Sequence, residues 1–272
     1  MANPVVARAE VVGTRADGPA RRVTVRCATA AARFRPGHFA ALTAPAGSVD
    51  VLRHAVPVLR ADGDTLDLLL PADPPPLLDL IAPLGTPYPQ PDAPGCALLL
   101  GEDTQAGPLL ALAEQLLAAG SQVAFVLVAE SAGRLYGVDA ARELTADVLL
   151  LTADGSAGLP LGDDPAALLD QALSALDADL LYTAASPELT AAAVAAATAR
   201  GARSWTAVAT EMPCGTGLCL GCVLPVRDAD GVSRLVRACT EGPVFDGVRV
   251  RWGGLDTVPA DVEGADAGGA GE

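Results

Sequence analysis

Apolar runs that alternate with helix-like segments between residues 96 and 210 constrain the fold of this chain most strongly. The runs CALLLG, QVAFVLVA, DVLLLTA, ADLLYTA and SWTAVAT begin at residues 96, 122, 147, 178 and 204. The clearest helix-like segments between them cover residues 106–120, 164–177 and 186–201. Such alternation is typical of a parallel sheet with helices on both faces. We therefore predict a doubly wound α/β domain over residues 95–210.

The region before this domain has a different pattern. Short β-type runs cover residues 5–12, 21–27, 38–45 and 64–70, and turn signals such as Pro36-Gly37 and Asp62-Gly63 separate them. Short strands at this spacing favour a small antiparallel barrel. A proline-dense stretch, residues 72–95, ends the region. We predict an antiparallel β-barrel over residues 1–94.

The charge of the chain limits the partners and chemistry to be expected. The formal net charge is −15, and all eighteen basic residues are arginine. Nucleic acid and anionic membranes are therefore not expected partners, since both need clustered positive charge. The absence of lysine excludes Schiff-base catalysis and lysine-dependent phosphate loops. The start of the chain lacks a signal peptide and no apolar run reaches membrane-spanning length, so we expect a cytoplasmic location.

Three of the six cysteines lie within nine residues, in the stretch CGTGLCLGC. Cys214, Cys219 and Cys222 are spaced C-x4-C-x2-C, and Cys239 follows after sixteen intervening residues. Four thiolates at this spacing match the plant-type [2Fe–2S] pattern. Gly215, Gly217 and Gly221 lie between them, and they would allow the positive-φ turns of a loop that surrounds a cluster. We predict a small [2Fe–2S] domain over residues 211–252.

Two other uses of these cysteines remain open. Zinc usually takes paired short-spaced ligands, whereas here three cysteines are close together and the fourth is distant. Free or disulfide-bonded cysteines are the other alternative, although disulfides are rare in a reducing compartment. Cys27 and Cys96 lie in apolar runs and are expected to be core residues. The acidic, glycine-rich residues 253–272 are expected to form a disordered tail.

The cysteine region also resembles a known family. The stretches EMPCGTGLCLGCV (211–223) and ACTEGPVFDG (238–247) are similar to the cluster domain of the electron-transfer subunit of type B dihydroorotate dehydrogenase. That family has the pattern M-x-C-G-x-G-x-C-x-x-C, followed by C-x-[DE]-G-P-V-F. Its domain order, a flavin-binding barrel, a nucleotide-binding α/β domain and a C-terminal [2Fe–2S] domain, agrees with the order predicted here.

The resemblance implies FAD in the barrel, and the corresponding motifs differ in this chain. The family's Arg-Pro-x-Ser motif aligns with the stretch HAVP, which begins at His54 and follows Arg53. Its Gly-x-Gly-Thr segment aligns with LPADPPP (70–76), while a proline-leucine-glycine turn is kept at Leu84 and Gly85. By resemblance, the FAD contacts would be Arg53, His54, Leu84 and Gly85.

The nucleotide motifs of the family differ as well. Its glycine-rich turn after the first strand aligns with a turn that contains Glu102 and Asp103, and its Cys-Gly-Pro aligns with Ala185-Ser186-Pro187. Carboxylates repel a pyrophosphate, and these two acids are better explained as helix N-terminal residues that complement the helix dipole. NAD is therefore not expected to bind by the standard route.

Two hypotheses about function follow from these patterns. In the first, the chain is an electron-transfer subunit in pyrimidine biosynthesis, whose [2Fe–2S] cluster exchanges electrons with the FMN-containing catalytic subunit of dihydroorotate dehydrogenase in a hetero-oligomer. In the second, it is a scaffold or interaction protein that keeps the cluster for folding or docking and has lost the flavin and nicotinamide sites.

Overall fold

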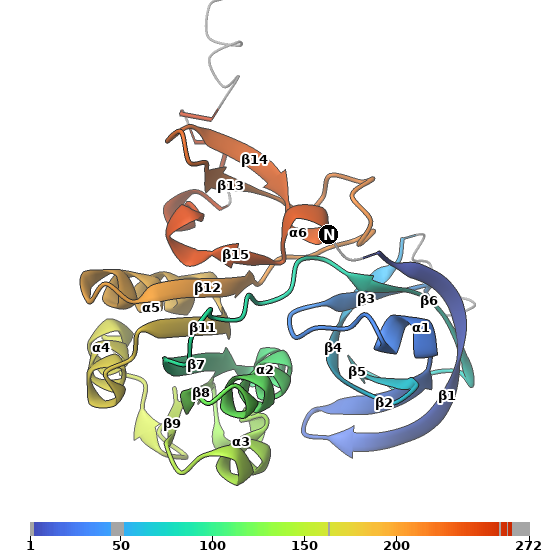
Figure 1. The fold of residues 1–272 in the computed structure, drawn as a ribbon, viewed down its shortest axis with the longest axis horizontal. Helices are drawn as coiled ribbons and strands as arrows, with labels where there is room; N and C mark the ends of the chain where they lie inside the picture. The colour runs from blue at the N-terminus through green and yellow to red at the C-terminus, as the bar shows by residue number, and fades with distance from the viewer. Residues whose placement is uncertain (1–2, 45–51, 163, 256, 260, 263–272) are drawn as a thin grey trace, which may run out of the picture.

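The computed structural model describes residues 3–44, 52–162, 164–255, 257–259 and 261–262. It contains a barrel, an α/β domain and a smaller cysteine domain that lies across both (Figure 1). The cysteine domain comprises the loop at 209–222 and the elements that follow it. Among the described residues, no helix combines the length and apolar content that crossing a bilayer requires.

The barrel is closed and antiparallel, as predicted, with strand order β1-β2-β5-β4-β3-β6. Alternate residues of its strands point inward, and Val23, Val25, Leu66 and Leu68 are fully buried there. The barrel elements are β1 (Val5–Asp17), β2 (Ala20–Arg26), α1 (Ala28–Ala31), β3 (Phe39–Leu42), β4 (His54–Asp62), β5 (Thr65–Leu70) and β6 (Leu77–Leu84).

The α/β domain has a seven-stranded sheet in the order β10-β9-β8-β7-β11-β12-β15. Apolar side chains on one face pack against α2 and α3, and those on the other face pack against α4 and α5, which gives two separate cores. Its elements are β7 (Cys96–Glu102), η1 (Asp103–Ala106), α2 (Gly107–Ala118), β8 (Gln122–Ala129), η2 (Ala132–Arg134), α3 (Val138–Leu144), β9 (Val148–Thr152), β10 (Leu159–Pro160), α4 (Pro165–Leu176), β11 (Leu180–Ala185), α5 (Pro187–Ala199) and β12 (Arg203–Val208). The predicted doubly wound arrangement is confirmed.

The cysteine domain contributes the last strand of that sheet. β15 pairs antiparallel with β12, in the register Trp205↔Asp246, Thr206↔Phe245 and Ala207↔Val244. Its other strands form an antiparallel hairpin, β13 with β14. Its elements are β13 (Val223–Arg227), β14 (Ser233–Arg237), α6 (Ala238–Glu241), β15 (Val244–Asp246), η3 (Gly247–Arg249) and η4 (Trp252–Gly254). The cysteine domain is therefore joined to the α/β domain through backbone pairing.

The barrel contacts the cysteine domain through Gly85, which follows β6. The Thr86 amide donates to the Gly242 carbonyl at 2.6 Å, and Thr86 and Pro243 form an isolated β-bridge. Gly85 has a φ of +81°, and a Cβ there would lie 2.5 Å from Cδ of Pro243. Only glycine fits this close approach without strain.

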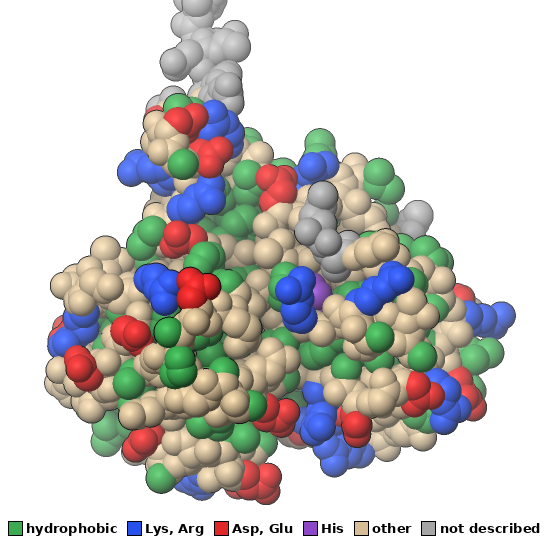
Figure 2. Space-filling model, in the orientation of Figure 1, with side chains coloured by type: hydrophobic (Ala, Val, Ile, Leu, Met, Phe, Trp, Pro, Cys, Tyr) green, Lys and Arg blue, Asp and Glu red, His purple; other side chains and the backbone are tan. Residues whose placement is uncertain are grey.

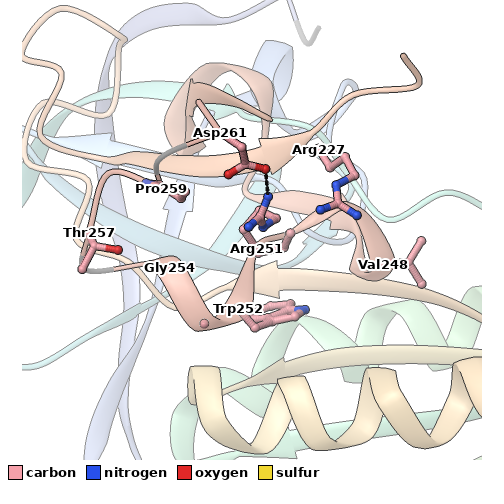
Figure 3. A pocket seen from close by; sticks show the side chains of 10 residues that line it. Arg227, Val248, Arg251, Trp252, Gly254, Thr257, Pro259 and Asp261 are labelled. Atoms are coloured by element: carbon pink, nitrogen blue, oxygen red, sulfur yellow. Dashed lines mark hydrogen bonds and ion pairs between the residues drawn. The ribbon is translucent and has the colours of Figure 1, made fainter. Parts of the chain in front are cut away.

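The described part of the predicted tail packs on the cysteine domain. Val262 is buried and forms a β-bridge with Ser233, while Asp261 pairs with Arg251. Asp261 and Arg251 border a cavity of about 700 Å³ that is also lined by Arg227 and Trp252 (Figure 3). Residues 263–272, where disorder was also predicted, lie outside the described residues.

Candidate metal centre and adjoining cavities

The four cysteines of the predicted cluster come from two segments that the β13–β14 hairpin brings together. Cys214, Cys219 and Cys222 lie on the loop between β12 and β13, and Cys239 lies in α6 directly after β14. The hairpin pairs Val223 with Arg237, and the Ala238 amide donates to the Cys222 carbonyl at 2.9 Å. Cys239 therefore returns to the loop although it is distant in sequence.

Backbone amides of the loop point at its sulfur atoms. Cys214 Sγ accepts from the amides of Thr216 and Cys219, both at 3.5 Å, and Cys219 Sγ accepts from the amide of Gly221 at 3.4 Å. Burial opposes ionisation of Cys214, but these amide donors outweigh it and lower the pKa of the thiol to about 6. N–H groups directed at sulfur are the environment that an iron–sulfur cluster requires.

The Cys239 thiol lies against the other cysteines. Burial, followed by a hydrogen bond and the charge of Cys222, raises the pKa of Cys239 to about 12, and Cys214 also contributes. Thiolates held this close together repel one another unless a cation lies between them. The donor set therefore fits a metal group bound by sulfur.

Two glycines permit the path of the loop, as predicted. Gly215 has a φ of +66°, and a Cβ there would lie 2.9 Å from Cβ of Ala41. Gly217 has a φ of +82°, and its Cβ would lie 2.7 Å from Cγ2 of Thr240. The positive φ expected at Gly221 is wrong, because Leu220 adopts it instead, at +58°.

The arrangement of the cysteines can be compared with a single-ion site and with a two-iron cluster. No group of three or more histidine, cysteine or acidic side chains converges on one ion position among the residues that the structure describes. A two-iron cluster needs no such point, because each iron takes two thiolates. All six cysteines are free; Cys27 is buried in the barrel as expected, whereas Cys96 is only partly buried because it begins β7 at the end of the sheet.

A cavity of about 280 Å³, the junction cavity, is lined by residues from all three domains. Phe39 from β3, Pro57 from β4, Tyr88, Gln105 and Met212 are among the residues that line it. A Cβ at Gly215 would lie 3.2 Å from Cε2 of Phe39, so the cysteine loop packs against the residue that forms this wall. The cavity therefore borders the cysteine domain directly, since Met212, two residues before Cys214, also lines it.

A second cavity, of about 790 Å³, opens on the barrel beside the first. Ala55 and Val56 line both cavities, and His54 lines the second. Its wall also includes Asp73 and three prolines without a backbone N–H, Pro71, Pro74 and Pro75. The two cavities adjoin through Ala55 and Val56, and this part of the wall offers few donors for phosphates.

The predicted flavin residues are therefore not all in one place. His54 lines the barrel cavity, and Arg53 donates weakly to the Asp79 carbonyl, at 3.4 Å. Leu84 and Gly85 instead pack against the cysteine domain, and neither borders the two cavities.

Sequence reasoning missed His38, which also lines the junction cavity and is 1% exposed. Its Nδ1 accepts from the Arg35 amide at 3.0 Å, so Nε2 carries the hydrogen, and that atom is buried without a partner. Burial, and next the charge of Arg35, lower the pKa of His38 to about 4. A neutral donor therefore lies in the cavity wall. The only sequence signal was the rarity of histidine.

Two acidic residues, Glu102 and Asp103, lie at the carboxyl end of β7 in the α/β sheet. The Ser186 amide, which precedes α5, donates to Glu102 Oε2 at 2.6 Å. Asp103 accepts from Arg134, with Nη2 at 2.5 Å and Nε at 3.1 Å. Both acids were expected to complement the helix that follows them. Glu102 instead reaches α5, which is distant in sequence.

The barrel, the doubly wound sheet and the terminal cysteine domain define a ferredoxin-reductase-like fold with an iron–sulfur-binding domain. The solved structures support this class. The NADH-dependent reduced ferredoxin-NADP oxidoreductase, described for flavin-based electron bifurcation, superposes with a TM-score of 0.76 and 22% identity over 96% of both chains. The cytochrome P450 reductase of Amycolatopsis gives a TM-score of 0.56 and 17% identity, over 74% of this chain and 67% of that one.

Sequence comparison gives the family. Residues 209–251 match the family model of the iron–sulfur cluster binding domain of dihydroorotate dehydrogenase B. The chain is 32% identical to the electron transfer subunit of dihydroorotate dehydrogenase B (NAD(+)) of Geobacillus thermodenitrificans, over 69% of this chain and 70% of that protein. It is 30% identical to the homolog of that subunit in Thermotoga maritima, over 71% of this chain and 62% of that protein. The chain belongs to the family of dihydroorotate dehydrogenase B electron-transfer subunits.

Proposed function

We propose that this chain carries electrons through one [2Fe–2S] cluster, bound by Cys214, Cys219, Cys222 and Cys239, to or from the FMN-containing catalytic subunit of a dihydroorotate dehydrogenase. The observation that carries the proposal is the position of Cys239 against Cys222 and Cys214, beside a loop whose amides point at sulfur. The relatives are named as electron transfer subunits of dihydroorotate dehydrogenase B, which supports a catalytic subunit of that enzyme as the partner and pyrimidine biosynthesis as the pathway. Six free cysteines are consistent with the reducing cytoplasm, where we place the complex.

The same arrangement suits a second redox group in the barrel. FAD would lie in the two adjoining cavities, with Ala55 and Val56 along its length and Phe39 between it and the cysteine loop. When bound, a flavin exchanges one or two electrons and a cluster exchanges one, so together they can divide a two-electron oxidation into single steps. The role of the chain would be to hold the two groups in adjoining domains, with Phe39 packed between the barrel cavity and the cysteine loop.

The surface around Cys219 is suited to docking of the partner subunit. Cys219 is exposed, and its neighbours Leu218 and Leu220 are 86% and 59% exposed. Apolar side chains that protrude around an exposed ligand lose water-accessible area when a partner covers them, which stabilises the complex.

Over the face in Figure 2, basic and acidic side chains are interspersed and form no single basic patch.

The proposal is tested by co-purifying the chain anaerobically with the dihydroorotate dehydrogenase catalytic subunit from the same organism. Dihydroorotate is then mixed with the complex in stopped flow, and cluster bleaching is followed. We expect a hetero-oligomer whose cluster is reduced. Leu218→Asp should weaken the complex and leave the cluster intact. The control, Leu159→Asp, makes the same change at a 49% exposed leucine on β10 and should not weaken the complex. A complex without cluster reduction would favour the scaffold hypothesis, and no complex would remove the proposed partner.

We expect FAD to be held loosely. Charge-assisted hydrogen bonds of the kind that the family's motif makes contribute about 1.5–3 kcal/mol each. The loss of two of them weakens binding by about two to four powers of ten. Flavin per chain should therefore fall on dialysis, measured from its absorbance, and the double variant His54→Arg/Pro57→Ser should retain more. Stoichiometric flavin in the unaltered chain after long dialysis would contradict this expectation.

A further inference from the structure

The α/β sheet has a crevice of the kind that binds nucleotides in this fold class. Strand order reverses between β7 and β11, because the chain continues from β7 to β8 and β9 on one side and from β11 to β12 on the other. In open α/β sheets, ligands bind outside the carboxyl ends of the strands at such a reversal. Glu102 ends β7, and Ser186 directly follows β11, so both lie at this point.

In this chain, the crevice is occupied by the protein itself. The short helix η1 contacts β7, β8 and β11, and therefore lies across the ends of the strands. Gly101 permits this close return, because a Cβ there would lie 2.5 Å from Cβ of Ala106. The turn therefore lies at the reversal, and its residues Thr104 and Gln105 also line the cavity of about 280 Å³ beside it.

Both groups that could attract a phosphate are already paired with carboxylates. A helix N-terminus binds anions through its free N–H groups, but the Ser186 amide before α5 donates to Glu102 at 2.6 Å. Arginine is the other usual phosphate ligand. Arg134, from the segment after β8, is held by Asp103 through two hydrogen bonds, at 3.1 and 2.5 Å.

The backbone around these acids is held in an unfavourable conformation. Asp103 has a φ of +47°, which non-glycine residues adopt only when their surroundings impose it. The carboxylate of the same residue holds Arg134 through two hydrogen bonds. The turn therefore keeps a strained residue where it neutralises the nearby arginine.

We propose that Glu102 and Asp103 bind the groups of the nucleotide crevice that would otherwise hold phosphate, and that they thereby exclude nicotinamide dinucleotides from this chain. Glu102 takes the position of a phosphate at the α5 N-terminus, and Asp103 neutralises the arginine beside it. The names of the relatives include NAD(+), so this chain differs from them in the electron carrier that it accepts. Exclusion of nicotinamide dinucleotides depends neither on the proposed partner nor on the cluster.

The test is calorimetric titration of the purified chain with NADH. We expect the unaltered chain to bind with a Kd weaker than about 1 mM. The variant Glu102→Ala/Asp103→Gly frees the α5 N-terminus and Arg134, and glycine accepts the positive φ. It should bind NADH at least about tenfold more tightly. Adding Arg134→Gln to this variant should remove most of the gain.

The matched control is Glu188→Ala. Glu188 is an exposed acid in the first turn of the same helix, α5, and its removal changes the net charge without opening the crevice. It should leave NADH binding as weak as in the unaltered chain. Asp103→Gly alone, which relieves backbone strain, serves as the test if the double variant does not fold.

Two results would overturn the proposal. One is micromolar binding of NADH by the unaltered chain, because the crevice would then be open. The other is binding by folded Glu102→Ala/Asp103→Gly that is no tighter than binding by Glu188→Ala, because the two acids would then not be what excludes the nucleotide.

Discussion

Replacing Cys239 with serine is expected to remove the metal cluster and to loosen the cysteine domain. The unaltered chain should contain about two irons and two acid-labile sulfides, with a rhombic EPR signal after one-electron reduction. In Cys239→Ser and Cys219→Ser, iron and sulfide should fall close to zero. A domain whose buried ligands lose their metal also loses folding free energy. The effect should be larger at Cys239, which is 1% exposed, than at Cys219, which is exposed.

The control for this prediction is Cys96→Ser, since Cys96 is partly buried and begins β7 in a different domain. It should keep the full iron and sulfide content. Metal analysis, sulfide assay and thermal unfolding are measured on all the variants together. One zinc per chain without labile sulfide would show that the site is of another kind, and a Cys219→Ser variant with full iron would remove that residue from the ligand set.

The second large effect is expected from Gly85→Ala at the contact between the barrel and the cysteine domain. A Cβ at Gly85 would lie 2.5 Å from Cδ of Pro243 and 2.9 Å from the Gly242 carbonyl oxygen, and the φ is +81°. Left-handed strain and overpacking each cost about 1–3 kcal/mol, so stability should fall by about 2–5 kcal/mol. The melting temperature should fall by about 10 °C, and the junction should become sensitive to protease.

Gly63→Ala separates the two causes. Gly63 has a φ of +55°, but a Cβ there would meet no atom within 4 Å, so the change adds strain without a collision. Its loss of stability should be the smaller of the two, and its protease sensitivity should be unchanged at the junction. Equal losses in both variants would mean that the contact with Pro243 is not what requires glycine at residue 85.

The α/β domain and the grouping of the four cysteines were predictable because their signals are local. β7 and β8 are continuous apolar runs bounded by turns, and the C-x4-C-x2-C spacing lies within one loop. The expected strands and helices agree with the observed ones to within a few residues. Alternation fixed the fold class because the chain can bury such runs only in a sheet covered on both faces.

Elements with weaker local signals were not predicted. β4 contains Pro57, and β6 lies within a proline-dense stretch, so neither resembles an ordinary strand. β15 is three residues long and is stabilised only by its pairing with β12. Short strands of this kind depend on a distant partner, which a local pattern does not reveal.

The site itself was only partly predictable, for a similar reason. The sequence indicated that Glu102 and Asp103 lie near the nucleotide turn, but the partner of Glu102 is Ser186, 84 residues further on. Leu84 and Gly85 were assigned to the flavin by resemblance, whereas the fold places them against the cysteine domain. Contacts between segments far apart in sequence decided each of these differences.

The pairing of β15 with β12 has a consequence for how electrons move. Many redox proteins carry their cofactor on a tethered module that swings between donor and acceptor, so that diffusion of the module limits turnover. Here the segment that follows the fourth cysteine is hydrogen-bonded into the central sheet. That pairing ties the metal centre to the α/β domain, and the Thr86–Gly242 hydrogen bond ties it to the barrel, so solvent viscosity should have little influence on transfer inside the subunit. Only the encounter with another protein can make such a circuit slow.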